Sequence, residues 1–230
     1  MIKEIADEIK DSISVSYEQV VREEYEMIIL KKLYESGQGK SFVFKGGTAL
    51  RLAYGSPRFS EDLDFTVVKD FSRKDLTILF KALEKNFDTL KLIETKQKYY
   101  TYFGLYRVKE DFMKQAFSIK FEASIRSTDY KEGKDYCLKS LSSPVTNLSV
   151  LALVDNIDNI KKDKEGIKPP RPRDVFDLWY INQEQGKSTD LDLKQFNRVE
   201  LNGGLLKNLP IGLRDILKIK SRNDTREIER

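Results

Sequence analysis

The stretch KGGTALRLAYGSPRFSEDLDF, residues 45–65, combines two adjacent glycines, a short apolar segment and two aspartates separated by one leucine. The residues SFVFKGG predict a short buried strand that ends at Gly46 and Gly47, and TALRLAYG predicts a helix from Thr48 to Gly55. DLDFTVV predicts a second strand. The stretch therefore indicates a strand, a glycine turn, a helix and a second strand in succession.

Two carboxylates lie close together on the second predicted strand. Asp62 and Asp64 are two residues apart, so their side chains leave the same face, with Cα atoms about 6–7 Å apart, while Leu63 and Phe65 face the core. Close anions repel each other, and a divalent cation or an arginine offsets that cost. Because Mg²⁺ favours carboxylate and phosphate oxygens, the pair predicts a Mg²⁺ or Mn²⁺ site. A strand-end turn or a salt-bridged surface pair is the alternative.

The glycine turn has the features of a phosphate cradle. Gly46 and Gly47 allow a sharp turn and a close approach to a ligand, and Thr48 starts a helix whose free N–H groups favour phosphate. The Walker pattern G-x-x-x-x-G-K-[ST] is missing, so this is not a P-loop. A plain turn is the alternative for the two glycines.

Two arginines and a serine lie between the turn and the aspartates. Arg51 and Arg58 are candidates for neutralising phosphate charge, and Ser60 for bonding a phosphate oxygen or holding the loop. An ion pair of Arg58 with Glu61 is the alternative.

The rest of the amino-terminal part reads as helices and antiparallel strands. Ser16-x-x-Gln19 resembles a capping box ahead of an amphipathic helix, and a second helix is predicted from about Arg73 to Phe87. Residues 89–140 alternate polar and apolar residues, broken by Gly104 and by DYKEGKDY, which predicts antiparallel strands and a hairpin.

From residue 145 onward the pattern turns helical, through NLSVLALVDNIDNI, PRDVFDLWYINQE and LRDILKIK. The sequence therefore predicts a mixed α+β sheet domain over residues 1–144 and a helical domain over residues 145–230.

Composition excludes several kinds of chemistry. The chain has 230 residues and is 40% hydrophobic, enough for a core, but it has no histidine and one cysteine, Cys137. Histidine bases, catalytic triads, ordinary His/Cys zinc sites and an intramolecular disulfide are thus excluded. No apolar run is long enough to span a membrane, which predicts a cytoplasmic protein without a membrane partner.

Two segments carry excess positive charge although the net charge is only +4. Residues 161–173 hold six basic and two acidic side chains, and residues 205–230 hold seven basic and four acidic side chains. Such segments suit a polyanionic partner, and solvated faces and tails are the alternative.

Strand, GGT, helix and then R-x-S-x-D-L-D together resemble the DNA polymerase beta-like nucleotidyltransferase superfamily, and within it the AbiEii/AbiGii-type toxins of abortive-infection and toxin–antitoxin systems. The match is strongest from Phe42 to Phe65, and weaker similarity extends through IKFEAS to RPRDVFDLWYI. The resemblance implies a polymerase beta-like mixed sheet flanked by helices. It also implies transfer of NMP from an NTP with Mg²⁺, to an acceptor such as the 3′ end of tRNA, and a cognate antitoxin.

The resemblance also implies roles for individual residues. Glu122, on the polar face of its predicted strand, fits a third catalytic carboxylate, and Lys120 on the same face fits a lysine that meets the triphosphate. An edge-strand lysine that prevents aggregation is the alternative for Lys120. The implied metal ligands are Asp62, Asp64 and Glu122, and the implied nucleotide-binding residues are Lys45, Gly46, Gly47, Thr48, Arg58, Ser60, Arg173, Asp174 and Asp177.

The carboxyl-terminal motif only partly matches the family. Arg173, Asp174 and Asp177 fit R-D-x-x-D on a helix, although Asp174 near the helix start is also favoured by the helix dipole alone. The preceding E-K-x-x-A is replaced by LVDNIDNIKK, with Lys161 and Lys162 a turn or more late. A non-catalytic nucleotide- or RNA-binding module on the same fold is therefore the alternative function.

Overall fold

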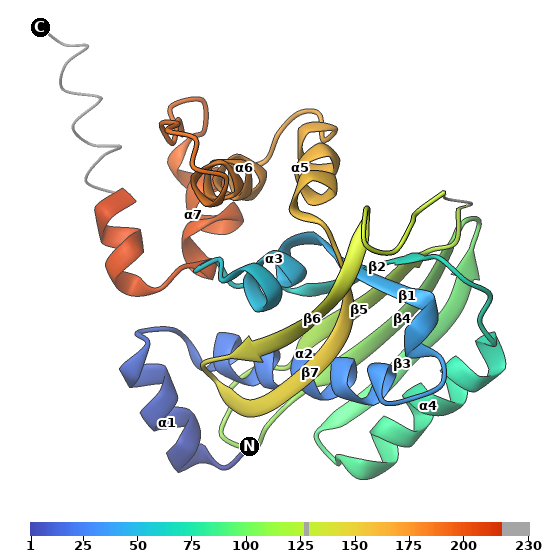
Figure 1. Cartoon of the computed structure of the whole chain (residues 1–230). Helices are drawn as coiled ribbons and strands as arrows, with labels where there is room; N and C mark the ends of the chain where they lie inside the picture. Colours follow the sequence, from blue (N-terminus) through green and yellow to red (C-terminus); the bar gives the residue numbers. More distant parts are fainter. Residues whose placement is uncertain (127–128, 218–230) are drawn as a thin grey trace, which may run out of the picture.

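The computed structural model describes residues 1–126 and 129–217, and a mixed sheet forms its centre (Figure 1). Within these residues seven strands lie in the order β3-β4-β5-β2-β1-β7-β6. Their bounds are β1 Phe42–Lys45, β2 Asp62–Val67, β3 Leu90–Lys98, β4 Thr101–Val108, β5 Phe117–Ser124, β6 Tyr136–Ser143 and β7 Thr146–Asp155. The β1–β7 and β2–β5 pairs are parallel, and the other four are antiparallel.

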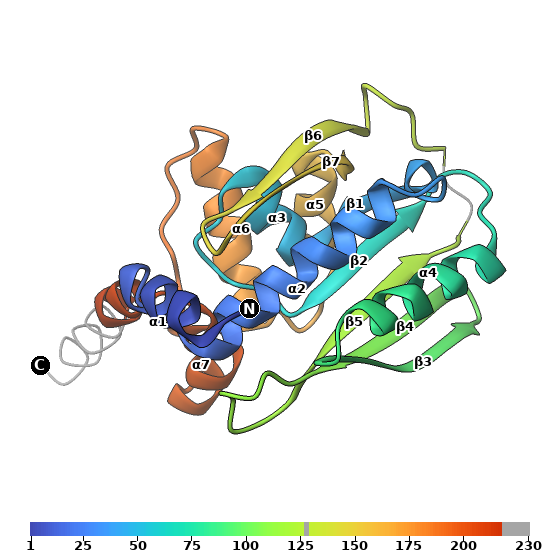
Figure 2. The ribbon, with the colours of Figure 1, turned by 90° about the horizontal axis from the view of Figure 1, so that it is seen from below.

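Helices cover the sheet unevenly. The α-helices are α1 Lys3–Ser12, α2 Tyr17–Tyr34, α3 Gly46–Tyr54, α4 Arg73–Asn86, α5 Ile157–Glu165, α6 Pro172–Glu184 and α7 Arg198–Gly204, with 3₁₀ turns at Gly39–Ser41 and Leu206–Asn208. The helices α2 and α4 lie along one face of the sheet (Figure 2), whereas α3, α5, α6 and α7 gather beyond the other face, near β1 and β2 (Figure 1). This predicted α+β class, a mixed sheet flanked by helices with a helical carboxyl-terminal part, is confirmed.

Local signals explain the elements around the opening stretch. The Ser16–Gln19 capping box forms, since the Ser16 side chain accepts from the Gln19 amide while Gln19 accepts from the Ser16 amide. Helix α3 begins at Gly46, two residues before the predicted start, and ends at Gly55 in the left-handed conformation. The order β1, α3, β2 follows the sequence prediction.

The core lies between the sheet and the α2–α4 layer. Leu63 and Phe65 of β2 point into it, as their alternation with the aspartates predicts. The rings of Phe65 and Phe121 stack at 4.5 Å, and Phe80 of α4 meets Phe121 edge-on at 4.9 Å. This packing fixes β2 against β5, the two strands that carry the predicted carboxylates.

The predicted change to helices at residue 145 is wrong for residues 146–155, which form β7. This strand carries apolar side chains on both faces, with Val150 and Ala152 buried and Leu151 64% exposed. An apolar run of this kind hides the two-residue period and resembles a buried helix. The first helix after the sheet is α5, whereas the division into domains 1–144 and 145–230 stays a prediction.

The antiparallel strands and hairpin predicted over residues 89–140 are confirmed, because β3 pairs with β4 as a hairpin and β4 pairs with β5. Strand β6, which follows DYKEGKDY, pairs with β7 at the far edge of the sheet. Strand β5 lies between β4 and β2, so Lys120 is on an interior strand and the edge-strand explanation for it fails.

The carboxyl-terminal part is helical as far as the structure describes it. Residues 211–217 form a helix that overlaps the predicted LRDILKIK segment, whereas residues 218–230, which complete that segment and the basic stretch 205–230, lie outside the described residues. Among helices of residues 1–126 and 129–217, none has the length and apolar character of a membrane span.

Candidate active site

Strands β2 and β5 bring four predicted residues onto one face of the sheet. In their parallel register Asp62 lies beside Lys120, and Asp64 lies beside Glu122. The Lys120 Nζ is 3.4 Å from the Asp62 carboxylate and 3.5 Å from the Glu122 carboxylate. The predicted metal ligands and the predicted lysine therefore form one cluster.

The charges of this cluster affect one another. Burial, with the neighbouring carboxylates Asp62 and Glu122, raises the pKa of Asp64 to about 6. Burial alone lowers the pKa of Lys120, but Asp62 and Glu122 outweigh it and raise that pKa. The site thus concentrates negative charge on β2 and β5, and a lysine ammonium offsets it in part.

The donor chemistry of the cluster fits a hard divalent cation. Asp62, Asp64 and Glu122 offer carboxylate oxygens, the ligands that Mg²⁺ and Mn²⁺ prefer, and burial together with the other two carboxylates raises the pKa of Asp64. Within residues 1–126 and 129–217, no three acidic or thiol side chains converge into a preformed metal cage. The Lys120 ammonium instead bridges Asp62 and Glu122.

The two glycines bring the backbone close to these residues. Gly46 has φ +79°, and a Cβ there would lie 2.7 Å from an Asp64 carboxylate oxygen. A Cβ on Gly47 would collide with the Arg58 guanidinium and lie 2.8 Å from Ser60 Oγ. Only glycine fits at either position without displacing a site residue.

The other predicted residues of the turn make structural contacts. Thr48 is buried, and its hydroxyl donates to the backbone carbonyl of Asp62 at 2.5 Å, which ties α3 to β2. Lys45 lies beside Asp64 in the β1–β2 register, and its Nζ pairs with Asp163 of α5 at 2.8 Å. Both side chains hold the cluster to its neighbours.

A cavity of about 250 Å³ opens over the cluster. Five of its lining residues are basic and three are acidic, and the whole lining is Gly47, Arg58, Ser60, Asp62, Asp64, Lys120, Glu122, Lys164, Arg171 and Arg173. Acidic groups on two strands thus face a basic wall from the loop before β2 and from α5 and α6. This arrangement accommodates a phosphate chain on one side and its cation on the other.

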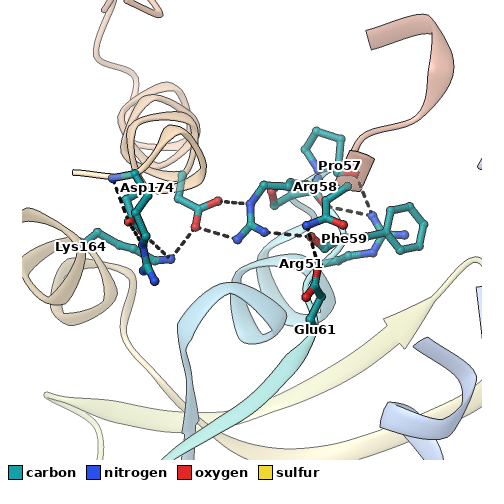
Figure 3. A network of polar contacts seen from close by, with 11 residues as sticks. Arg51, Pro57, Arg58, Phe59, Glu61, Lys164 and Asp174 are labelled. Carbon is teal, nitrogen blue, oxygen red and sulfur yellow. Dashed lines mark hydrogen bonds and ion pairs between the residues drawn. The ribbon is translucent and has the colours of Figure 1, made fainter. Parts of the chain in front are cut away.

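The basic wall is held by a buried ion network (Figure 3). Arg58, 2% exposed, donates from Nε and Nη2 to the two Asp177 oxygens at 2.6 and 2.8 Å. Lys164 pairs with Asp177 at 2.6 Å and with Asp174 at 3.3 Å. Asp177 therefore positions two cations of the cavity at once.

Asp174 and Asp177 support the cavity and do not line it. Burial alone raises the pKa of Asp177, but Arg58 and Lys164 outweigh it and hold that pKa below its ordinary value. Arg171 and Lys164 lower the pKa of Asp174 against burial in the same way. Asp174 also accepts from the Arg171 amide at 3.3 Å, which closes the start of α6.

Of the two arginines predicted to contact phosphate, Arg58 lines the cavity and Arg51 does not. Arg51 turns away from the cavity to pair with Glu23 of α2, lies 3.5 Å from the Phe59 ring centre, and donates to the carbonyls of Ser56 and Pro57 at 3.2 Å (Figure 3). It shapes the loop before β2, so its predicted contact with phosphate is wrong.

The alternative pairing of Arg58 with Glu61 is also wrong. Arg58 takes Asp177 as its partner, and Glu61 pairs with Lys207 at 2.8 Å. Phe176 is buried, and its ring centre lies 5.4 Å from that of Trp179 in a small core of the helical part.

Sequence reasoning missed Lys164 and Arg171. The segment LVDNIDNIKK, which stands in place of E-K-x-x-A, is not one helix, because Asp155 ends β7 and Asn156 caps α5. A signal for Lys164 was present, since it follows the buried Ile160 by four residues and so shares its inward face. Lysine on a buried helical face needs an acidic partner, which here is supplied by α6.

Comparison with known proteins supports this assignment of the site to a nucleotidyltransferase fold. A Helicobacter pylori protein classed provisionally as a nucleotidyltransferase is 25% identical, with TM-score 0.52, over 72% of this chain and 69% of its own. JHP933 from Helicobacter pylori is 20% identical, with TM-score 0.55, over 94% of this chain and 98% of its own. MenT4, a nucleotidyltransferase toxin from Mycobacterium tuberculosis, is 14% identical, with TM-score 0.60, over 94% of this chain and 86% of its own.

One part of the sequence matches a family model. No curated protein sequence matches the chain significantly. Residues 28–134, which include the glycine turn, β2 and β5, match the family described as the nucleotidyl transferase AbiEii toxin of type IV toxin–antitoxin systems. Over residues 28–134 the chain is therefore similar to the nucleotidyl transferase domain of the AbiEii toxin family.

Proposed function

We propose that the protein transfers a nucleoside monophosphate from an NTP to the 3′ end of an RNA, with tRNA as the acceptor, as the toxin of a toxin–antitoxin pair in the cytoplasm. The observation that carries the proposal is the position of three carboxylates opposite a basic wall in one cavity. Carboxylates with a divalent cation and basic groups for phosphate are the two parts that phosphoryl transfer requires.

In this proposal Asp62, Asp64 and Glu122 hold Mg²⁺ or Mn²⁺. A divalent cation held by these carboxylates would supply Lewis-acid chemistry, which would make the acceptor hydroxyl more acidic and offset the charge on pyrophosphate. The remaining work belongs to the chain's own cations. Lys120 lies beside the carboxylates and Lys164 on the opposite wall, so together they hold the triphosphate across the cavity.

The glycine turn and the basic wall orient the donor. Gly46 and Gly47 let the phosphates approach the backbone, and Arg58, Ser60 and Arg173 contact phosphate oxygens from the cavity wall. The acceptor oxygen attacks the α-phosphorus, the bond to the β-phosphate oxygen breaks, and pyrophosphate leaves. Asp174 and Asp177 act through the cations that they position.

RNA is favoured as the acceptor by charge. The lining of the cavity carries more basic than acidic side chains, and the segment 161–173 that supplies Lys164, Arg171 and Arg173 holds six basic residues against two acidic. A polyanion is attracted to such a surface, and its binding weakens as salt rises.

A labelled-nucleotide assay tests the proposal. The purified protein is incubated with Mg²⁺, total RNA and each α-³²P-NTP in turn, beside Asp64→Asn and the matched control Asp70→Asn, an exposed aspartate beyond the end of β2. Label in RNA is expected with wild type and control and not with Asp64→Asn. Full transfer by a folded Asp64→Asn would refute the proposed site. Absence of transfer to any RNA by wild type would instead favour the non-catalytic binding module.

A growth assay tests the role as a toxin. Expression of the wild-type chain is expected to arrest bacterial growth, and the Asp64→Asn variant at equal abundance is expected to allow it. Rescue of the wild-type arrest by an adjacent gene would identify the cognate antitoxin. Equal arrest by both variants would contradict toxicity through nucleotidyl transfer.

A further inference from the structure

The carboxylate face of the sheet continues, uncovered, from β5 across β4 to β3. Helix α4 packs on the opposite face, where Tyr106 donates to the Phe80 carbonyl at 3.0 Å and Gly104 leaves room for the Phe80 ring. The residues of β4 that alternate with Gly104 and Tyr106 therefore face the same side as Glu122. In Figure 1 no helix of residues 1–126 or 129–217 lies over this side of β3 and β4.

An aromatic ring lies next to the catalytic cluster on this face. Phe103 of β4 is the direct cross-strand neighbour of Glu122, and Leu105 is the neighbour of Lys120. Directly opposed residues on neighbouring strands have Cβ atoms about 4.5–5.5 Å apart. Both apolar side chains are partly exposed although they sit on an open polar face.

Basic side chains surround Phe103 along the two outer strands. Lys96 is its partner on β3, with Nζ 5.3 Å from the ring centre, and it also pairs with Glu94 at 2.6 Å. Lys98 and Arg107 are exposed on the same face, and no ion pair joins either to another residue of the described chain. With Lys91, the β3 and β4 part of this face carries four basic residues and one acidic residue, Glu94.

The turn between β3 and β4 extends this surface. Tyr99 and Tyr100 are 90% and 61% exposed, and the Arg126 guanidinium lies 5.8 Å from the Tyr100 ring. Exposed aromatic rings interleaved with basic groups are the pattern by which sheets bind single-stranded nucleic acid, with bases on the rings and phosphates on the cations. An acidic protein surface would use the cations but would leave the rings without partners.

We propose that the open face of β3 and β4 binds the single-stranded 3′ end of the acceptor RNA. The terminal base stacks on Phe103, which places its sugar hydroxyls beside Glu122. The preceding phosphates follow Lys96 and Lys98 toward the β3–β4 turn, and Arg107, on the other side of the ring, adds positive charge to the surface. The donor triphosphate occupies the opposite side of the carboxylates, at Gly47, Arg58 and Lys164. This inference rests on the proposed transfer to RNA and assigns that acceptor a surface.

Binding of RNA without NTP tests the surface separately from catalysis. The probe is a fluorescein-labelled single-stranded RNA octamer, followed by fluorescence anisotropy at two salt concentrations. Phe103→Leu keeps an apolar side chain but removes the stacking ring, and it is expected to weaken binding about 5- to 100-fold. Thermal melting checks that this variant remains folded.

Charge reversal provides the matched comparison. Lys98→Glu with Arg107→Glu is expected to weaken octamer binding and to reduce its salt dependence. Lys81→Glu with Lys85→Glu makes the same charge change at exposed positions of α4, on the opposite face. Because salt screens charges at that distance from the RNA, this variant is expected to bind the octamer within about twofold of wild type. Equal losses in the two double variants would overturn the assignment of this face.

The outcomes separate the surface from the proposed function. Transfer to RNA by wild type and by Phe103→Leu with the same KM for RNA would overturn the surface and leave the proposed function standing. Octamer binding that depends on Phe103, without transfer by wild type to any RNA, would support the surface and contradict the proposed function. Sensitivity to charge reversal with no effect of Phe103→Leu would overturn base stacking and point to a protein partner.

Discussion

Arg58 and Asp177 form a buried, two-bonded ion pair that joins the loop before β2 to helix α6, 119 residues later in the chain. Arg58 lines the cavity and Asp177 lies behind it, and Lys164 of α5 pairs with the same carboxylate. Three segments that are distant in sequence thus meet at one aspartate. This contact holds the basic wall in place opposite the carboxylates of β2 and β5.

Asp177→Asn is expected to destabilise the protein and to disorder the basic wall. The amide leaves Arg58 and Lys164 buried without their anion, and breaking a buried pair in this way costs about 3–5 kcal/mol. Urea unfolding measures the loss. Transfer activity at a temperature where the variant is folded is expected to fall through a raised KM for the NTP.

The control for this substitution is Asp190→Asn, at an exposed position beyond α6. It is expected to change the free energy of unfolding by less than about 0.5 kcal/mol. Similar stability of both variants would show that the Arg58–Asp177 contact contributes little.

The strand pattern of the site was predictable because it is local. Leu63 and Phe65 alternate with the two aspartates, so the sequence placed both carboxylates on one face, and the same alternation placed Glu122 on the exposed side of its strand. The register that sets Asp64 beside Glu122 depends on tertiary packing of β2 against β5. Family resemblance supplied that link where periodicity alone did not.

The supporting network was not predictable from local pattern. Arg58 has a carboxylate, Glu61, three residues away, yet it pairs with Asp177 of a distant helix. Residues 146–155 read as a helix because leucine and alanine favour helices and because both faces of the strand carry apolar residues. Placing that strand wrongly also moved the expected helical lysine away from Lys164.

Lys164→Met is expected to reduce transfer while Lys162→Met, at an exposed position of the same helix, is not. The Lys164 ammonium lines the cavity and pairs with Asp177 at 2.6 Å. Loss of a charge-assisted contact costs about 1.5–3 kcal/mol, which corresponds to about 10- to 200-fold in kcat/KM. Steady-state kinetics with varied NTP measures the effect, and equal kinetics of the two variants would exclude Lys164 from phosphate binding.

Gly47→Ala is expected to destabilise the protein although the substitution lies within helix α3. Alanine in a helix is favoured over glycine by about 1 kcal/mol, so the substitution would stabilise the protein if there were room for the new Cβ. The new Cβ collides instead with the buried Arg58 guanidinium, and such overpacking costs about 1–3 kcal/mol. Gly37→Ala, with no atom within 4 Å of its Cβ, is the control, and a more stable Gly47→Ala would contradict the close approach.

Glu26→Gln is expected to stabilise the protein at pH 8 and to have little effect at low pH. Glu26 is 1% exposed with an unpartnered buried oxygen, and burial raises its pKa well above the ordinary 4.5. The unfolded chain therefore loses this proton first, so wild-type stability falls as pH rises from about 4.5 through the folded pKa. At pH 8 the free energy of unfolding, measured with urea, is expected to be about 1–3 kcal/mol higher for the variant than for wild type. The same gain at pH 4, or from the exposed control Glu8→Gln, would contradict this explanation.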